Sequence, residues 1–323
     1  MRSTFTPFGY AAVANEPAIT PITGPGLPLP MATFKTIGGQ TVAFVVAPLT
    51  GALLVWTTFL LGRRVQSDAI GLAAAWLVAT SPTFLIMFKT LMSDVPAAAF
   101  WALAVYGALG TSTRSAALAG LAASMAILIR PNVAPVAAVI ALWLAFADPK
   151  GGPRRSFLFA AAGAPGVIAV AAINQSLFDS PFSSGYGDLA SLFSLDNVPK
   201  TLGSYTRWLV ETQTPLVFAG VYVAWIAPLL GCVLLAVWML YAAYPAFDAW
   251  WFLRFLLPAW PAMFIGTAAA VFRLVRGRRA AAAILLLDLG AYGIYATNQR
   301  SVFVDGSAST FSSRRGWINR LHG

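Results

Sequence analysis

Long stretches without a charged residue dominate this sequence. Thr41–Gly62, Ala69–Phe88, Ser156–Phe178 and Phe255–Phe272 each run for 18 to 23 residues without Asp, Glu, Lys or Arg. An α-helix rises about 1.5 Å per residue, and about 20 apolar residues cross the hydrocarbon core of a bilayer. Because irregular backbone cannot face lipid, these runs predict membrane-spanning helices.

Five further runs share this character: Val95–Thr113, Ser115–Ile129, Pro131–Ala147, Thr212–Phe247 and Ala280–Thr297, the last of which contains Asp288. Hydrophobic residues make up 59% of the chain and charged residues 10%, against about 25% charged in soluble domains. A soluble globule would lack the polar residues to cover its surface, and a nucleic-acid-binding module is excluded for the same reason. The sequence therefore predicts an all-α, polytopic transmembrane bundle of about 8–10 helices with outer-face loops.

The rarest residue types exclude several kinds of site. Cys232 is the one cysteine and His322 the one histidine. Neither a disulfide framework within the chain nor a metal site built on paired histidines or thiolates is therefore expected. A divalent cation held by carboxylates stays open, although no two acids have a spacing that argues for one.

Basic residues gather in some junctions between the runs and indicate the orientation. Four junctions hold 10 of the 21 Lys and Arg residues: Arg63–Arg64, Arg114, Lys150–Arg155 and Arg273–Arg279. By the positive-inside rule these junctions are cytoplasmic. We therefore predict an extracytoplasmic Pro-rich segment at 1–40, a membrane domain at 41–297 with an outer loop at 179–211, and an extracytoplasmic segment at 298–323.

This orientation constrains the long run Thr212–Phe247. Residues 179–211 and 248–254 are then both outside, so the chain between them must cross the membrane an even number of times. We predict two short helices or a re-entrant hairpin that turns near Pro228–Gly231. Arg130 is predicted to lie at a similar outer turn, because a proline disfavours helical backbone at the residue before it.

Candidate functional residues lie in the outer segments. Lys89 and Asp94 belong to a short segment before Pro96, where Asp94 is either a helix cap or a carboxylate held at the membrane surface beside a lysine. Arg254 stands at the head of an apolar run. An arginine there either extends toward the lipid headgroups or binds a phosphate through charge-assisted hydrogen bonds.

The outer loop adds aromatic and acidic candidates. Tyr186, Trp208 and Glu211 lie in or next to this loop. Tyr and Trp at a membrane interface usually form an aromatic belt that anchors the protein. The alternative is that these side chains line the pocket for a sugar or its acceptor, with the rings stacked on the sugar.

In order and spacing, the segments around the predicted spans resemble those of the polytopic GT-C glycosyltransferases. The nearest branch looks like the one that includes lipid-A aminoarabinose transferases, protein O-mannosyltransferases and RgtA/B/C/D-like proteins. The similarity runs from about residue 8 to about residue 275. The segments that carry it are Gly24-Pro-Gly-Leu-Pro-Leu29, Gly62-Arg-Arg64, Met92-Ser-Asp-Val-Pro-Ala97, Gly120-Leu-Ala with Ile129-Arg-Pro-Asn132, Ser184-Gly-Tyr-Gly187 and Leu253-Arg-Phe-Leu-Leu-Pro258.

The resemblance implies a reaction and roles for individual residues. GT-C enzymes move a sugar from a polyprenyl-phosphate donor to a hydroxyl group of a lipid, a glycan or a protein at the outer face of the membrane, here the inner membrane of a bacterium. By this resemblance, Lys89 and Arg254 bind the donor phosphate, because cations stabilise the departing phosphate. Asp94 is a substrate-positioning or auxiliary acid, and Glu16 stands in for the catalytic base.

The chain also departs from the family pattern. GT-C enzymes usually carry the catalytic carboxylate just after an initial membrane helix, whereas here only the Pro-rich segment precedes Thr41, and Glu16 is its only acid. A truncated, non-catalytic member of the family is therefore one alternative. A transporter or flippase of lipid-linked glycans is another, but the internal repeats that are common in transporters are not evident.

Overall fold

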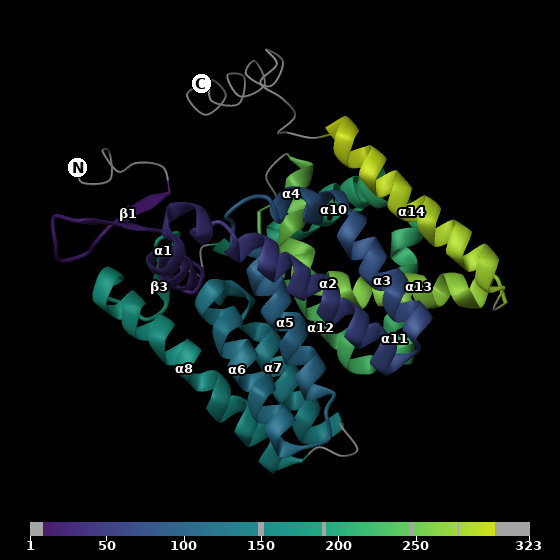
Figure 1. Ribbon diagram of the computed structural model, residues 1–323. Helices are drawn as coiled ribbons and strands as arrows, with labels where there is room; N and C mark the ends of the chain where they lie inside the picture. Colours follow the sequence, from purple (N-terminus) through teal and green to yellow (C-terminus); the bar gives the residue numbers. More distant parts are fainter. Residues whose placement is uncertain (1–8, 148–151, 189–191, 246–248, 277, 301–323) are drawn as a thin grey trace.

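The computed structural model of the chain describes residues 9–147, 152–188, 192–245, 249–276 and 278–300 (Figure 1). Most of these residues are helical and the helices pack as a bundle, which confirms the predicted architecture. Two short antiparallel hairpins accompany the helices: β1 (Tyr10–Ala12) with β2 (Ile19–Pro21), and β3 (Ser183–Ser184) with β4 (Gly187–Asp188). The segment predicted at 298–323 lies outside the described residues from residue 301 onward.

Within the described residues, four helical stretches are long and apolar enough to cross a bilayer. They are α2 (Val46–Val65), α8 (Pro153–Phe178), η6 (Trp250–Ala259) continued by α13 (Trp260–Leu274), and α14 (Arg279–Arg300). A fifth is formed by Leu195–Gln213 and Pro215–Ile226 if this pair, bent by 108°, counts as one span. It comprises η4 (Leu195–Asn197), α10 (Val198–Gln213), η5 (Pro215–Tyr222) and α11 (Val223–Ile226).

The remaining helices are shorter. They are α1 (Pro28–Ala43), α3 (Asp68–Thr80), α4 (Pro82–Met87), α5 (Asp94–Ala108), α6 (Thr113–Ile129), η2 (Pro131–Val133), α7 (Pro135–Leu142), η3 (Trp143–Ala147) and α12 (Pro228–Ala242). Several are apolar but have fewer than the about 20 residues that a full crossing needs.

The first long helix begins later than the uncharged run that predicts it. The run starts at Thr41, whereas α2 starts at Val46. The helix α1 covers the end of segment 1–40. It begins at Pro28, and proline is favoured at the first helical position because the backbone N–H there has no partner within the helix. α1 is kinked at Gly38 and Gly39, and the φ of +79° at Gly39 is one that glycine adopts without strain. The Pro-rich segment is thus partly helical.

Two interruptions predicted at prolines are confirmed. α6 ends before Arg130, whose backbone leaves the helical region with φ −147° and ψ 86°. α11 ends before Ala227, which has φ −149° and ψ 82° and directly precedes Pro228. A Cβ atom on Gly231 would lie 2.5 Å from the Cα atom of Ala224, so the chain folds back on itself at this break.

The backbones of helices α6 and α8 are in close contact at glycine residues. A Cβ atom added to Gly120 would collide with the carbonyl oxygen of Phe159, and one added to Gly166 would collide with the carbonyl oxygen of Ser124. Small residues at such crossings let helix backbones approach closely, which is the usual packing mode in lipid. The two helices therefore run together along one side of the bundle (Figure 1).

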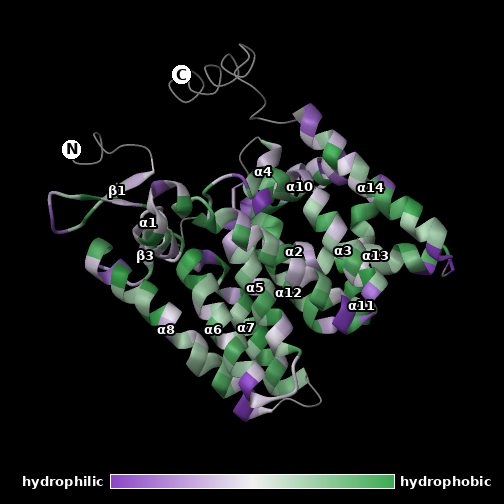
Figure 2. Ribbon diagram, viewed as in Figure 1, coloured by the Kyte–Doolittle hydropathy of each residue, from purple (hydrophilic) through white to green (hydrophobic). Residues whose placement is uncertain are grey.

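Polar residues gather at the ends of the helices. Figure 2 shows hydrophobic colours along most of the bundle, and hydrophilic colours at the start of α8 and at the turn between α13 and α14. At another end of the bundle, η6 contacts α4, α5 and α12. The elements that carry Asp94 and Arg254 meet there.

Candidate functional site

A buried ion cluster lies where these elements meet. Asp94 is 2% exposed and forms an ion pair with Nη1 of Arg130 through its Oδ1 atom. The Nε atom of Arg254 lies 4.0 Å from the same carboxylate oxygen. The side chains of Arg130 and Arg254 are 13% and 17% exposed. The structure therefore brings the predicted residues Asp94 and Arg254 together and adds Arg130; we call these three residues the Asp94 cluster.

Each member of the cluster occupies a helix end or an irregular position. Asp94 is the first residue of α5, where a carboxylate interacts favourably with the helix dipole. Arg130 lies in the break after α6, which Pro131 enforces. Arg254 lies in the 3₁₀ helix η6 ahead of α13. Asp94 is not the cap of this helix, because Ser93 is the N-cap residue and no described side chain forms a capping hydrogen bond there. Its side chain instead pairs with cations from two other parts of the chain.

Aromatic rings cover both guanidinium groups. The Cζ atom of Arg130 lies 4.9 Å from the ring centre of Phe255 and 5.7 Å from that of Tyr241. The Cζ atom of Arg254 lies 4.9 Å from the ring centre of Phe252 and 5.3 Å from that of Phe255. The attraction between a cation and the face of an aromatic ring is stronger when water is excluded. The rings therefore hold the two arginines in place inside the bundle.

The cluster carries more positive than negative charge. Two guanidinium groups face one carboxylate among the described residues, which leaves one positive charge without a counterion. The Nε atom of Arg254 and the Oδ1 atom of Asn132 are buried and have no hydrogen-bond partner in the described part of the chain. An uncompensated charge of this kind is strongly unfavourable inside a protein. An anion with oxygen atoms would both neutralise the charge and accept the free N–H group.

Lys89 lies near this cluster in the chain but at the surface. It is exposed in the turn between α4 and α5, and its Nζ atom lies 5.9 Å from the ring centre of Phe88. In the same turn, the Sδ atom of Met92 lies 3.0 Å from Nη1 of Arg254. The turn thus connects an exposed lysine with the buried cluster.

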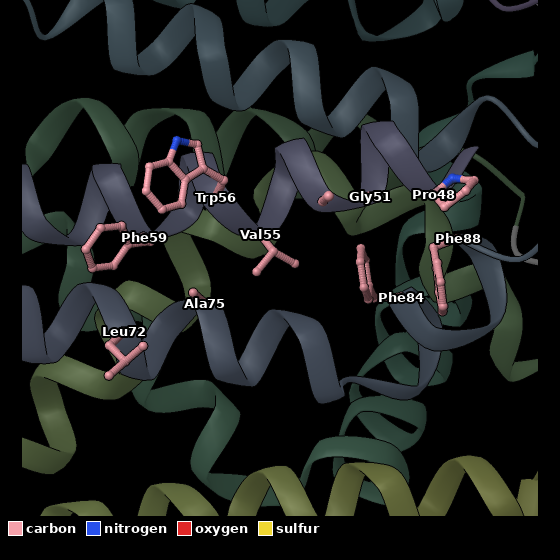
Figure 3. A pocket seen from close by; sticks show the side chains of 10 residues that line it. Pro48, Gly51, Val55, Trp56, Phe59, Leu72, Ala75, Phe84 and Phe88 are labelled. Carbon is pink, nitrogen blue, oxygen red and sulfur yellow. The ribbon is translucent and has the colours of Figure 1, made fainter. Parts of the chain in front are cut away.

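An apolar groove begins at the same turn (Figure 3). It has a volume of about 580 Å³. Its lining comes from α2, α3 and the end of α4: Pro48, Gly51, Ala52, Val55, Trp56, Phe59, Leu72, Ala75, Phe84 and Phe88. The rings of Phe84 and Phe88 are stacked at a centroid distance of 5.4 Å. The groove therefore runs from beside Lys89 along helices α2 and α3.

The structure does not bring Glu16 to the cluster. Glu16 is exposed at the tip of the hairpin between β1 and β2. This tip is attached to the end of α8, where the amide of Ala14 donates to the carbonyl of Leu177 at 2.9 Å and Nδ2 of Asn15 donates to Asp179 at 2.6 Å. Figure 1 shows the hairpin at the edge of the bundle.

Tyr186 lies in the turn of the second hairpin, and it is 53% exposed. Tyr244, which follows the end of α12, packs edge-on against Phe255 at a centroid distance of 5.4 Å. Burial raises the pKa of the Tyr244 phenol, the neighbouring hydroxyl of Tyr186 raises it further, and Arg130 and Arg254 oppose the rise. The Tyr186 hydroxyl therefore influences the phenol of Tyr244, whose ring packs on Phe255.

The other two predicted pocket residues lie along α10. Trp208 is 3% exposed, and its ring packs at 6.0 Å from the ring of Tyr205. Glu211 forms an ion pair with Arg207 at 4.0 Å, and its carbonyl accepts a hydrogen bond from the Tyr292 hydroxyl on α14. Trp208 therefore packs against Tyr205 inside the bundle, and Glu211 links α10 to α14.

Arg130 was not singled out as a site residue from the sequence, where it marks only a turn. A signal was present, because it is a single cation between two uncharged runs, and an ionisable residue at membrane depth usually has a partner or a function. Asp94 is the partner that the structure supplies. No group of three or more His, Cys, Asp or Glu side chains that could hold a metal ion occurs among the described residues.

The helices and their connections form the GT-C fold. Two solved structures with this fold match the chain at 14% identity. ArnT from Cupriavidus metallidurans bound to undecaprenyl phosphate gives a TM-score of 0.58, and the match covers 88% of this chain and 56% of ArnT. The oligosaccharyltransferase from Archaeoglobus fulgidus in complex with zinc and sulfate gives a TM-score of 0.53, with 99% and 49% covered. The chain thus spans about half the length of these proteins.

A sequence family described as oligosaccharyl transferase STT3, N-terminal, matches residues 30–92. This part runs from α1 to the turn before Asp94. No curated protein matches the chain significantly. The resemblance to GT-C glycosyltransferases is therefore confirmed at the level of the fold.

Proposed function

We propose that the chain is an integral membrane glycosyltransferase, or part of one. It would take a sugar from a polyprenyl-phosphate donor and transfer it to a hydroxyl group of a lipid, a glycan or a protein at the outer face of a bacterial inner membrane. The observation that carries this proposal is the Asp94 cluster, which holds one more positive than negative charge in a largely buried position. A donor phosphate supplies the missing negative charge and the oxygen acceptors.

The apolar groove supports a donor that carries a long hydrocarbon chain. The groove begins beside Lys89 and is lined by aliphatic and aromatic side chains. We propose that the polyprenyl chain lies in this groove (Figure 3), with its phosphate turned toward Lys89 and Arg254. The ArnT structure cited above contains undecaprenyl phosphate, which is a ligand of this chemistry.

The proposed transfer assigns a task to each group. The bond between the anomeric carbon and the phosphate oxygen breaks, and the acceptor oxygen bonds to that carbon while its proton passes to a carboxylate. Arg254 and Lys89 stabilise the negative charge on the departing phosphate. Asp94 positions the two arginines. For Glu16 to take the proton, the β1–β2 hairpin has to move toward the cluster.

The sugar and its acceptor would lie on the outer side of the cluster. Tyr186, an exposed ring in the turn of the β3–β4 hairpin, would stack on a sugar ring. Trp208 and Glu211 would shape the pocket indirectly, through the position of α10.

The test is donor binding and sugar transfer by the protein purified in detergent, with a panel of polyprenyl-phosphate sugars. Arg254→Ala should weaken donor binding about 10- to 100-fold, since a hydrogen bond to a charged group contributes about 1.5–3 kcal/mol. Arg64→Ala is the matched control, because Arg64 contacts the carbonyl and ring of Tyr106 instead. Equal donor affinity of Arg254→Ala and wild type would overturn the proposal.

The same panel separates the alternatives. Donor binding without transfer would favour a non-catalytic family member. Movement of a fluorescent lipid-linked glycan across liposomes that contain the protein, without transfer, would favour a flippase. The described charges lie mainly at helix ends rather than along a path through the bundle, and this distribution favours a surface reaction over transport.

A further inference from the structure

A second groove lies at a different end of the bundle, between η5–α11 and α13. It has a volume of about 720 Å³. Its lining includes Val221, Tyr222, Trp225, Arg273, Leu274 and Arg276. The groove opens next to a close helix crossing, because a Cβ atom on Gly266 would collide with the carbonyl oxygen of Gly220.

The walls of this groove expose large apolar side chains. Trp225 is 87% exposed, Leu274 72% and Val221 68%. Side chains of this kind on a membrane protein face lipid, and tryptophan favours the level of the headgroups. The walls therefore fit hydrocarbon chains that enter from the bilayer.

The end of the groove is positively charged. Nη1 of Arg273 donates a hydrogen bond to the hydroxyl of Tyr222 at 2.8 Å, and the guanidinium lies 5.6 Å from the centre of that ring. Arg276 follows the end of α13 and also lines the groove. The C-terminal end of α13 carries about half a negative charge from the helix dipole. The two positive charges of Arg273 and Arg276 outweigh it. The lining contains no Asp or Glu, so the end of the groove attracts an anion.

This groove is separate from the Asp94 cluster. Arg254 and Arg273 stand near opposite ends of the continuous stretch Trp250–Leu274. With helical rises of about 1.5–2.0 Å per residue, the two residues lie about 30 Å apart along the axis, which is the thickness of the hydrocarbon core. A lipid at Arg273 therefore belongs to the leaflet opposite to the proposed donor site.

We infer that this groove binds an acidic phospholipid of the cytoplasmic leaflet. Its phosphate contacts Arg273 and Arg276, and its acyl chains cover Val221, Trp225 and Leu274. Basic grooves between membrane helices on the cytoplasmic side are suited to anionic headgroups.

The test is native mass spectrometry of the detergent-purified protein with a mixture of phosphatidylglycerol and phosphatidylcholine. We expect wild type to retain phosphatidylglycerol selectively, and the double variant Arg273→Gln/Arg276→Gln to lose retention about thirtyfold, given the usual contribution of each basic residue near an anionic headgroup. Trp225→Ala should also lower retention, without changing the preference for the anionic headgroup. The matched control is Arg63→Gln/Arg64→Gln, which removes two exposed cations of another predicted cytoplasmic junction.

Equal retention by the groove variant and wild type would overturn the inference, and so would an equal loss in the control variant. Displacement of the lipid by millimolar inorganic phosphate would indicate a simple anion site and contradict it. A dimer that Trp225→Ala dissolves would assign the groove to a second copy of the chain instead. Arg254→Ala should retain phosphatidylglycerol like wild type, so failure of the donor proposal would leave this result intact.

Discussion

The Asp94 carboxylate sets the electrostatics of the cluster at the scale of single residues. It is the counterion of Arg130 and lies 4.0 Å from Arg254. Removing one partner of a buried pair leaves a charge that neither water nor protein compensates. The residue that holds the site together in the absence of donor is therefore the acid rather than either arginine.

This role predicts a specific pattern of stabilities. Asp94→Asn should lower the free energy of unfolding by about 3–5 kcal/mol, because two buried guanidinium groups then lack a counterion. Asp94→Asn/Arg130→Met should lose less than the single variant, since the second change removes one of these charges. Thermal unfolding in detergent measures both variants. Additive losses in the double variant would contradict the coupling.

The sequence alone could not supply all of these contacts. The sequence predicts Asp94 and Arg254 as site residues because their residue types suit phosphate and proton chemistry. It does not predict Arg130, because the pairing of Arg130 with Asp94 depends on how α5 and α6 pack, and the two residues are 36 positions apart. Residue type alone predicts Trp208 in the pocket, whereas its 3% exposure follows from the side of α10 that faces the bundle.

At the scale of helices, proline and glycine determine much of the arrangement. The breaks at Arg130 and Ala227 could be predicted because each precedes a proline and each interrupts a long run. The partner of each glycine could not be predicted, since glycine is frequent throughout the sequence. The α6–α8 crossing shows which glycines bring backbones into contact.

Alanine should have opposite effects at a glycine in this crossing and at a glycine with open space around it. Gly120→Ala should destabilise the protein by about 1–3 kcal/mol, because the new methyl group meets the carbonyl of Phe159 on α8. Gly203→Ala in α10 is the control, since nothing lies within 4 Å of its added Cβ atom. This change should raise stability by about 0.5–1 kcal/mol. A thermal shift of the same sign in both variants would refute the packing argument.

At the scale of the whole molecule, the proposed function links the α2–α3 groove to the Asp94 cluster. The sequence predicts both helices as membrane spans, but not a groove between them, since a groove depends on how side chains such as Trp56 and Phe84 leave space. A side chain that fills the groove and leaves the cluster unchanged tests this link.

Val55→Trp provides this test, because Val55 points into the middle of the groove (Figure 3). We expect it to weaken binding of a polyprenyl-phosphate sugar at least about tenfold, since the chain loses the hydrophobic contacts of the groove. Leu118→Trp adds the same ring on α6, where Leu118 is 64% exposed and outside this groove. Its affinity for the donor should equal that of wild type. Equal affinities of all three proteins would exclude the groove as the site of the chain.

The stretch Trp250–Leu274 carries a guanidinium group near each end, one held by Asp94 and aromatic rings and the other beside Tyr222. A shift of this helix along its axis would move one of these charged groups toward hydrocarbon, where a charge is unfavourable. The two arginines therefore oppose such a shift in either direction. Piston-like motion of this helix is therefore disfavoured, and conformational change at the Asp94 cluster is expected in the surrounding turns and hairpins.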